Sequence, residues 1–407
     1  MKAAREAGAS LPVPMVSSKL SGWMIFVMAC ACGMSIANIY YAQPLVSVMS
    51  SSIGLPSTLA SVIVTVTQVG YCVGLLALVP LGDLVESRRL VLATLAMASV
   101  ALLLVARAES VGALLGACLL LGACSVAVQM IIPMATHLSP ASVRGSVVGS
   151  ITSGLLAGIM LARPMAGLVS SAYGWRVVFV ICAASLVSMV IILRIVLPEH
   201  RAAKNESYRA LIASLPRLLR ETPVLRRRAA YQAALFAAYS LFWTSVPFVL
   251  SAPTFGLSQR EIALFATSAI AGAFAAPVAG RLADAGRTTA ATGIGICLTV
   301  TSFAIAWLAR DGSVLLMVFS AVLLDIGVWS NLVLGQRAIS MLAPAHRSRM
   351  NALYTSIFFA GGALGSSCAS LAYATGGWQL ICLIGILFPL AALLFYGRGE
   401  KWRDALL

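Results

Sequence analysis

The second half of this 407-residue chain repeats features of the first half at a nearly constant spacing. Leu81-Gly82-Asp83 ends one apolar stretch, and Leu282-Ala283-Asp284 ends another stretch 201 residues later. Gly174-Trp175 recurs as Gly377-Trp378, at an offset of 203 residues. Self-similarity at a fixed long period indicates a duplicated structural unit. The chain is therefore expected to fold as two related halves.

Apolar stretches long enough to cross a membrane carry this repeat. The chain is 60% hydrophobic and only 10% charged, whereas soluble domains carry about 25% charged residues. A membrane-spanning helix needs roughly 20 apolar residues, and the alternating pattern of a transmembrane β-barrel is absent. We predict an all-α membrane protein with 12 transmembrane helices in two pseudo-symmetric six-helix bundles. The predicted spans are 22–43, 58–80, 90–107, 111–136, 147–169, 177–197, 229–251, 262–282, 288–309, 313–335, 351–373 and 378–396.

The net charge of +15 raises the question of nucleic-acid binding, but the positions of the charges answer it. When both termini are placed in the cytoplasm, 23 of the 28 Lys and Arg residues fall on the cytoplasmic side. This bias is the positive-inside pattern that orients membrane proteins. The basic loops are therefore interpreted as orientation signals that also contact anionic lipid. We expect a multi-pass protein with both termini cytoplasmic, the lipid bilayer as a partner and no nucleic acid.

The polar stretches divide the chain into five predicted segments. These are a cytoplasmic N-terminal tail (1–21), an N-terminal six-helix bundle (22–197), a cytoplasmic central loop (198–228), a C-terminal six-helix bundle (229–396) and a cytoplasmic tail (397–407). The tail 1–21 has no short apolar core of its own, so we expect no cleaved signal peptide.

The central loop contains one segment with amphipathic helical spacing. Leu211, Leu215, Leu218 and Leu219 share one face, and Arg217 and Arg220 are available to contact lipid headgroups. This pattern predicts a short helix that lies on the membrane surface.

Enzyme and metal motifs are missing from the sequence. There is no Gly-rich phosphate loop with a Lys, and no arrangement of Ser or Cys with His and a carboxylate that could converge. The nine cysteines fall within predicted spans as small apolar residues, and the three histidines show no zinc spacing. We expect no enzyme activity, no catalytic residues, no cofactor and no metal.

The loop between the second and third spans carries a recognisable motif. It reads Pro80-Leu81-Gly82-Asp83-Leu84-Val85-Glu86-Ser87-Arg88-Arg89, and a degenerate copy with Asp284 and Arg287 follows the eighth span. This motif resembles the signature of the major facilitator superfamily, and span count and loop placement extend the resemblance over the whole chain. The resemblance implies the fold of that superfamily and an alternating-access transporter.

The resemblance also implies a gating latch. The carboxylates of Asp83 and Asp284 would accept hydrogen bonds from the exposed N–H groups at the start of a helix in the opposite half, the eleventh and the fifth span respectively. Arg88, Arg89 and Arg287 would pair with these carboxylates. The alternative is a positive-inside turn with a local helix cap.

The fifth span is rich in small residues. Gly154 and Gly158 lie four residues apart, a spacing that lets two helices approach closely. The run from Gly149 to Gly167, with Arg163-Pro164 inside it, is similar to the antiporter motif of drug:proton exchangers. Tyr41-Ala42-Gln43-Pro44 and Gly174-Trp175-Arg176 look like a bacterial efflux branch of the superfamily. Helix packing alone would also explain the glycines.

Two charged residues lie deep within predicted spans, Arg163 and Asp325. A charge at such depth is costly, so each should face protein or water and have a partner. Asp325 is predicted to exchange protons or bind substrate, because burial and a nearby cation both act on a carboxylate's charge state. Arg163 is predicted to attract an anionic or polar substrate group or to control the proton on Asp325. A structural ion pair, or snorkelling of Arg163 to the headgroups, is the alternative.

Other predicted lining residues share helix faces that would point to a cavity. They are Asn38, Tyr41, Gln68, Gln129, Tyr239, Trp243, Trp329 and Gln336. Aromatic walls with sparse polar anchors suit amphipathic solutes, although aromatic stripes also serve helix packing.

The resemblance therefore implies proton-coupled efflux, by antiport, of a small amphipathic organic compound across the bacterial inner membrane. The expected partners are the small-molecule substrate and protons, and the expected oligomeric state is a monomer. Two alternatives stay open. One is uptake or exchange of an organic anion with Arg163 as the anion clamp, and the other is a membrane sensor that transports nothing.

Overall fold

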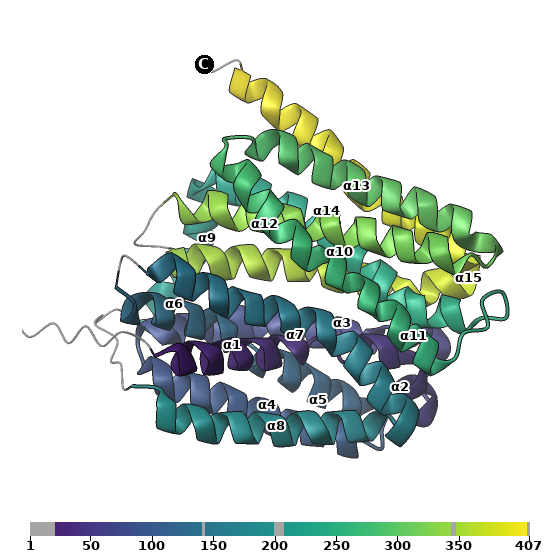
Figure 1. Cartoon of the computed structure of the whole chain (residues 1–407), viewed down its shortest axis with the longest axis horizontal. Helices are drawn as coiled ribbons and strands as arrows, with labels where there is room; N and C mark the ends of the chain where they lie inside the picture. The colour runs from purple at the N-terminus through teal and green to yellow at the C-terminus, as the bar shows by residue number, and fades with distance from the viewer. Residues whose placement is uncertain (1–20, 141–142, 199–206, 343–346, 405–407) are drawn as a thin grey trace, which may run out of the picture.

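Two groups of helices lie side by side in the computed structural model of the chain, which describes residues 21–140, 143–198, 207–342 and 347–404. Figure 1 shows the N-terminal half, purple to teal, beneath the C-terminal half, green to yellow. The start of α1 and the end of α15 lie at the same end of the bundle, as an even number of spans requires. Within the described residues every regular element is helical, which confirms the predicted all-α fold.

The N-terminal half contains eight α-helices and three short 3₁₀ segments. In chain order they are α1 (Gly22–Ala37), η1 (Gln43–Leu45), α2 (Val46–Ser52), η2 (Ser57–Leu59), α3 (Val62–Ala77), η3 (Val79–Asp83), α4 (Ser87–Arg107), α5 (Val111–Cys124), α6 (Val128–Leu138), α7 (Arg144–Tyr173) and α8 (Trp175–Val196).

The linker helix and the C-terminal half follow. They comprise α9 (Tyr208–Glu221), α10 (Pro223–Ser251), α11 (Gln259–Phe265), η4 (Ala266–Ile270), α12 (Ala271–Asp284), α13 (Thr288–Leu308), η5 (Ala309–Asp311), α14 (Val314–Ser340) and α15 (Arg347–Asp404).

The helices agree with twelve predicted spans. Among the described residues, nine helical segments are long and apolar enough to cross a membrane. One of them, within α15, contains Gly377 at φ 58°, where the chain turns and two spans meet. The remaining two are the shorter apolar helix α1 and the segment formed by α11, η4 and α12.

The first, fourth and eighth predicted spans are broken in the structure although their hydropathy is continuous; the eighth is divided into α11, η4 and α12. The first span ends as a helix at Ala37, and Pro44 within η1 has no N–H to continue a regular helix. The fourth span is interrupted between α5 and α6, at Ser125 to Ala127. There the carbonyl of Ser125 accepts a hydrogen bond from Ser35 of α1 at 3.0 Å. Tertiary contacts therefore compensate for lost helical hydrogen bonds, a feature that hydropathy does not report.

Close packing by glycine joins α1 to α7. A Cβ atom built on Gly158 would lie 2.2 Å from the carbonyl oxygen of Gly33, and one built on Gly154 would lie 2.5 Å from that of Ala29. Only glycine permits such an approach of two backbones. The packing role predicted for Gly154 and Gly158 is therefore confirmed.

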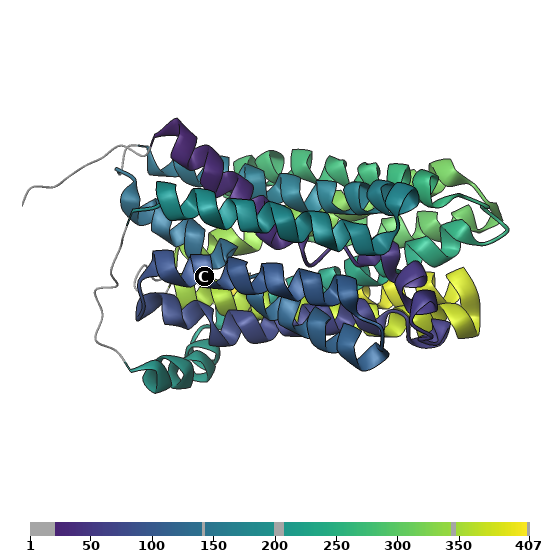
Figure 2. The same ribbon diagram turned by 90° about the horizontal axis from the view of Figure 1, so that it is seen from below.

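The predicted amphipathic helix in the central loop is present as α9. Leu211 and Leu215 are buried, whereas Arg217 and Arg220 are exposed. The apolar face, however, packs on α10, α15 and η3 of the bundle. Figure 2 shows α9 in teal beneath one end of the bundle. The protein itself therefore covers at least part of the apolar face of α9, which the sequence pattern predicted to contact the membrane.

Candidate functional site

A buried arginine connects the two halves of the chain. Arg163 on α7 is 1% exposed. Its Nε donates to Oε1 of Gln43 in η1 at 2.7 Å, and its Nη2 donates to the hydroxyl of Tyr239 in α10 at 2.8 Å. Gln43 belongs to the N-terminal half and Tyr239 to the C-terminal half. Arg163 is therefore anchored on its own half and crosses to the other through one hydrogen bond.

Aromatic rings surround the guanidinium group. Its Cζ atom lies 4.5 Å from the ring centroid of Trp243, 4.9 Å from that of Tyr40 and 5.2 Å from that of Tyr239. A cation over the faces of such rings is stabilised by their quadrupoles, most strongly where water is excluded. This aromatic cage, defined here as Tyr40, Tyr239 and Trp243, partly compensates for burying the charge of Arg163.

The second buried charge, Asp325, lies on α14 and is completely buried. Trp329, one turn further along the same helix, donates its indole N–H to Asp325 Oδ1 at 2.9 Å. The ring of Trp329 meets the ring of Tyr239 edge to face, with centroids 5.5 Å apart. A continuous path therefore runs from Arg163 through Tyr239 and Trp329 to Asp325.

Arg163 and Asp325 act on each other electrostatically, and Trp243 and Tyr239 also lie within interaction range of the carboxylate. Among the described residues, no direct ion pair joins the two charges. Four buried atoms of this cluster also have no partner of good hydrogen-bond geometry within the described part of the chain. These atoms are Arg163 Nη1, Gln43 Nε2, Trp243 Nε1 and Asp325 Oδ2.

Gly272 of α12 supports the carboxylate end of the cluster. A Cβ atom at this position would lie 2.5 Å from Cδ1 of Trp329 and 3.2 Å from Cβ of Asp325. The absence of a side chain therefore lets α12 pack directly against the pair formed by Asp325 and Trp329.

Two further predicted lining residues make contacts between the halves beside this cluster. Gln68 of α3 donates to Ser240 of α10 at 2.9 Å and accepts from Ser366 of α15 at 3.2 Å. Gln129 of α6 accepts from Asn351 of α15 at 2.7 Å. Both side chains belong to the interface of the halves but not to the cluster of Arg163 and Asp325.

Three predicted lining residues lie apart from the cluster. Asn38 donates to Ser125 within the N-terminal half at 3.3 Å. Tyr41 interacts with Cys182 of α8, again within its own half. Gln336 shares a face of α14 with Asp325, but its side chain is exposed near the end of that helix.

The side of the cluster opposite α9 is closed by contacts between the halves. The Gln259 side chain of α11 donates to the carbonyl of Pro44 at 3.1 Å. On the same two helices, a Cβ atom on Gly167 of α7 would lie 2.6 Å from Cβ of Ala263 of α11. By the predicted topology this is the outer side of the membrane.

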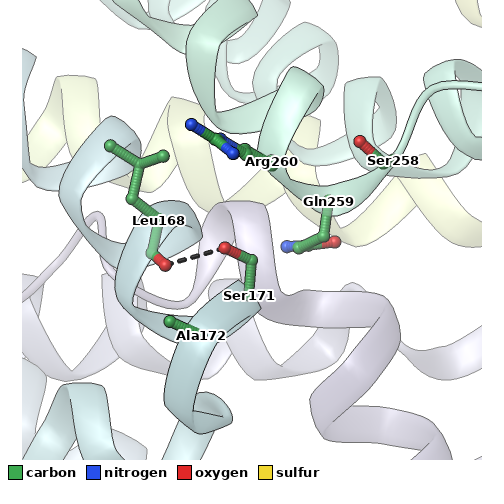
Figure 3. Close-up of a pocket in the computed structure, with 6 residues that line it drawn as sticks. All are labelled: Leu168, Ser171, Ala172, Ser258, Gln259 and Arg260. Carbon is green, nitrogen blue, oxygen red and sulfur yellow. Dashed lines mark hydrogen bonds between the residues drawn. The ribbon is translucent and has the colours of Figure 1, made fainter.

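A surface hollow of about 560 Å³ lies between α7 and the start of α11, next to these contacts. Figure 3 shows its lining residues, with Ser171 hydrogen-bonded to the carbonyl of Leu168; the residues are Leu168, Ser171, Ala172, Ser258, Gln259 and Arg260.

Comparison with known proteins places the fold in a family. A sequence model of the Major Facilitator Superfamily matches residues 25–327 and again residues 229–405. The chain belongs to the major facilitator superfamily.

Relatives within the superfamily agree over nearly the full length. The uncharacterized transporter YgaY of Escherichia coli O157:H7 is 37% identical over 387 residues, covering 95% of this chain and 98% of that protein. The probable transporter SCO4007 of Streptomyces coelicolor is 31% identical, covering 88% of this chain and 83% of that protein. The chain is therefore a multi-pass membrane transporter.

Solved structures of the superfamily share the fold at low sequence identity. A POT family transporter in complex with 5-aminolevulinic acid matches with a TM-score of 0.76 and 14% identity, over 94% of this chain and 99% of that one. A bacterial homologue of the human lysosomal transporter Spinster, inward-facing and unoccupied, matches with a TM-score of 0.73 and 15% identity, over 92% and 95%. These likenesses support the superfamily fold alone.

The superfamily signature lies at the α9 end of the bundle. The side chain of Asp83 lies outside the described part of the structure. Arg89 pairs with Glu86 at 2.6 Å, and Arg88 donates to the carbonyl of Arg194. These two contacts stay within the N-terminal half.

The second copy of the signature also makes a contact within its own half. Asp284 pairs with Arg337 of α14, and Arg287 is exposed. Latching of Asp83 or Asp284 to the opposite half stays a prediction, and it concerns contacts that form and break as the halves move.

Sequence reasoning missed two members of the cluster. Gln43 and Tyr40 are both buried at the end of the first span. Both lie after the break at Ala37 and contact Arg163, Gln43 through a hydrogen bond and Tyr40 through its ring. The available signal was the Gln-Pro pair at the end of an apolar span, since Pro44 marks a break.

Proposed function

We propose that this transporter exchanges protons for a small amphipathic organic compound and exports that compound by alternating access. The proposal rests above all on one arrangement: two buried charges, Arg163 and Asp325, lie on opposite halves and are connected through Tyr239 and Trp329. Charges in a membrane interior are rare and mark ion pathways or ligand sites.

Rocking of the halves would act directly on this arrangement. Arg163 keeps its bond to Gln43 within the N-terminal half, so separation of the halves breaks its bond to Tyr239. Asp325 and Trp329 remain together because they share α14. Opening therefore changes the electrostatic environment of Asp325, and a carboxylate whose environment alternates can take up a proton on one side and release it on the other.

The driving force for such exchange is adequate. One elementary charge that crosses a potential of 100 mV releases about 2.3 kcal/mol. A proton taken up by Asp325 from the outer side would displace the substrate there. Loss of that proton on the inner side would restore the binding site.

Proton movement in proteoliposomes tests the proposal. Protein is reconstituted with an internal pH dye and an imposed proton gradient, and a panel of dyes, drugs, nucleosides and organic acids is added. We expect substrate-dependent proton movement that is lost in Asp325→Asn. Asp311→Asn serves as a matched control, because Asp311 is a largely exposed carboxylate remote from the cluster. Full substrate-dependent proton movement in Asp325→Asn would refute the proposal.

One observation favours a second candidate, uptake or exchange of an organic anion. The Nη1 atom of buried Arg163 has no hydrogen-bond partner among the described residues, and such a group can receive an anion. Arg163→Lys would then abolish anion movement but spare neutral compounds, because Lys cannot form a planar two-point contact.

The setting of the transporter is part of the proposal. We place it as a monomer in a bacterial inner membrane with both termini in the cytoplasm, since the basic loops then follow the positive-inside pattern. Cysteines introduced near the ends of the chain should react with an impermeant reagent only after the cells are opened. Absence of any gradient-coupled movement in proteoliposomes would favour a membrane sensor instead.

A further inference from the structure

The buried cluster presents hydrogen-bond donors at one end and an acceptor at the other. From this polarity we infer that the substrate is amphoteric, with an acidic group that binds Arg163 and Gln43, a basic group that binds Asp325, and an apolar or aromatic body between them. The inference relies on the proposed function for the location of the substrate site, but not for the coupling to protons.

The donor end consists of two N–H groups on side chains that are hydrogen-bonded to each other. Gln43 is completely buried, Arg163 is 1% exposed, and the bond between Arg163 Nε and Gln43 Oε1 holds the two side chains together. Arg163 Nη1 and Gln43 Nε2 both lack a partner among the described residues. These two donors, one of them charged, are available to the oxygens of an acidic group.

The acceptor end consists of one carboxylate oxygen. Trp329 donates to Oδ1 of Asp325, and Oδ2 lacks a partner of good geometry within the described chain, with the side chains of Trp243 and Tyr239 within interaction range. A fully buried carboxylate favours a charge-assisted donor such as an ammonium group. Gly272 packs against Trp329 and the Cβ of Asp325, so α12 covers this side of the acceptor.

Aromatic rings occupy the space between the two ends. Tyr239 stands between Arg163 and Trp329, and Tyr40 and Trp243 flank the guanidinium group. These side chains offer apolar faces to a ligand, with few polar groups between the charged ends. When the halves separate, these faces would line the space between the acidic and the basic group of a ligand, which favours a short aromatic or aliphatic body.

Substrates with only one charge match the cluster less well. A cation that binds Asp325 would leave Arg163 facing a positive ligand, and an anion that binds Arg163 would face the carboxylate. A neutral apolar compound would leave both buried charges without ligand partners, which carries a desolvation cost. An amphoteric ligand supplies a partner to each charge at the same time.

The separation of the donor and acceptor ends also implies how a proton would compete with the substrate. The basic group of the substrate and a proton would occupy the same carboxylate, so binding of either excludes the other from Asp325. The acidic group would meanwhile replace Tyr239 or occupy the open Nη1 position on Arg163.

Three probes with one aromatic body test the inference: L-phenylalanine carries both charges, 2-phenylethylamine only the amine and 3-phenylpropionate only the carboxylate. Binding to the purified full-length protein is measured by calorimetry at neutral pH without any gradient. We expect phenylalanine to bind about tenfold to 100-fold more tightly than either analogue, because each lost charge-assisted hydrogen bond weakens binding by that order.

Two variants test which charged group of the ligand binds Arg163 and which binds Asp325. Arg163→Gln should remove the preference of phenylalanine over phenylethylamine, and Asp325→Asn should remove its preference over phenylpropionate. Asp325→Glu keeps the carboxylate and should retain part of its preference, which separates recognition from a failure to fold. Thermal unfolding of each variant is monitored in parallel.

The result that overturns the inference is phenylalanine binding no more tightly than the better analogue, including no binding by any probe. Tighter binding of phenylpropionate would identify an anion site, and tighter binding of phenylethylamine a cation site. If phenylalanine is preferred but proteoliposomes show no proton movement, the substrate class stands and the proposed antiport fails.

Discussion

Arg163 on α7 and Tyr239 on α10 form a hydrogen bond of 2.8 Å between the two halves of the transporter, inside a cluster of aromatic rings. The arginine is also bonded to Gln43 of its own half at 2.7 Å. The donor is thus fixed by one half and the acceptor is supplied by the other. A change in the relative position of the halves therefore acts directly on this bond.

Removal of the Tyr239 hydroxyl is predicted to weaken the closed arrangement. Tyr239→Phe leaves Arg163 Nη2 buried without its partner, at a cost of about 1–3 kcal/mol. We expect faster amide hydrogen exchange in α10 and α7 near the bond, and transport slowed by about tenfold or more. Tyr373→Phe is the control, since its hydroxyl bonds to Phe248 within the C-terminal half. Equal effects of the two substitutions would contradict the prediction.

The contact between Gly167 and Ala263 is predicted to control closure of the outer side. In Gly167→Ala the new Cβ would lie 2.6 Å from Cβ of Ala263, so α7 and α11 must separate. We expect increased hydrogen exchange in residues 258–270. Gly116→Ala provides the comparison, because a Cβ there meets no atom within 4 Å. Unchanged exchange in Gly167→Ala would show that the contact does not hold the outer side closed.

A side chain at position 272 is predicted to disturb the carboxylate end of the site. Gly272→Ala brings a Cβ to 2.5 Å from Trp329, so the indole that donates to Asp325 must move. We expect weaker substrate binding, by about tenfold, if one hydrogen bond to the charged group is lost. Gly280→Ala on the same helix meets no atom within 4 Å and should bind normally. Substrate titrations measure the affinity of both variants, and equal affinities would contradict the prediction.

The start of α11 is predicted to loosen in acid. The hydroxyl and backbone N–H of Ser258 donate to Glu261 and lower the pKa of its carboxylate, which is exposed outside the membrane-spanning segments. A depressed pKa means that the cap is fully formed above the ordinary Glu value of about 4.3 and is lost as the pH falls through the folded value. Hydrogen exchange at the first turn of α11, corrected for intrinsic rates, should therefore rise below that pH.

A substitution provides the check on this interpretation. Ser258→Ala should raise exchange at the first turn already at neutral pH and reduce its dependence on acid, because the capping box is broken. If the acid response in Ser258→Ala equals that of the unmodified protein, Glu261 is not its cause.

Much of the fold follows from hydropathy and the repeat. Apolar length predicts the spans, and the deep positions of Arg163 and Asp325 single them out because charges at that depth are rare. The break in the fourth span cannot be predicted from the sequence, since Ser35 and Ser125 compensate for it through a contact between distant residues. Gln336 shows that a shared helix face does not by itself place a residue in the site. It shares a helix face with Asp325, but the face leaves the buried interface before reaching it.

The backbone contacts of Gly33 and Gly158 indicate which segments remain packed together when the two halves move relative to each other. They join α1 to α7 closely, and the bond between Arg163 and Gln43 ties η1 to the same helix, so we expect these segments to move together. The C-terminal half holds Tyr239 on α10, separate from these segments. Movement of the halves in the proposed cycle would therefore separate the guanidinium group from the phenol, and the arginine would stay with the N-terminal half.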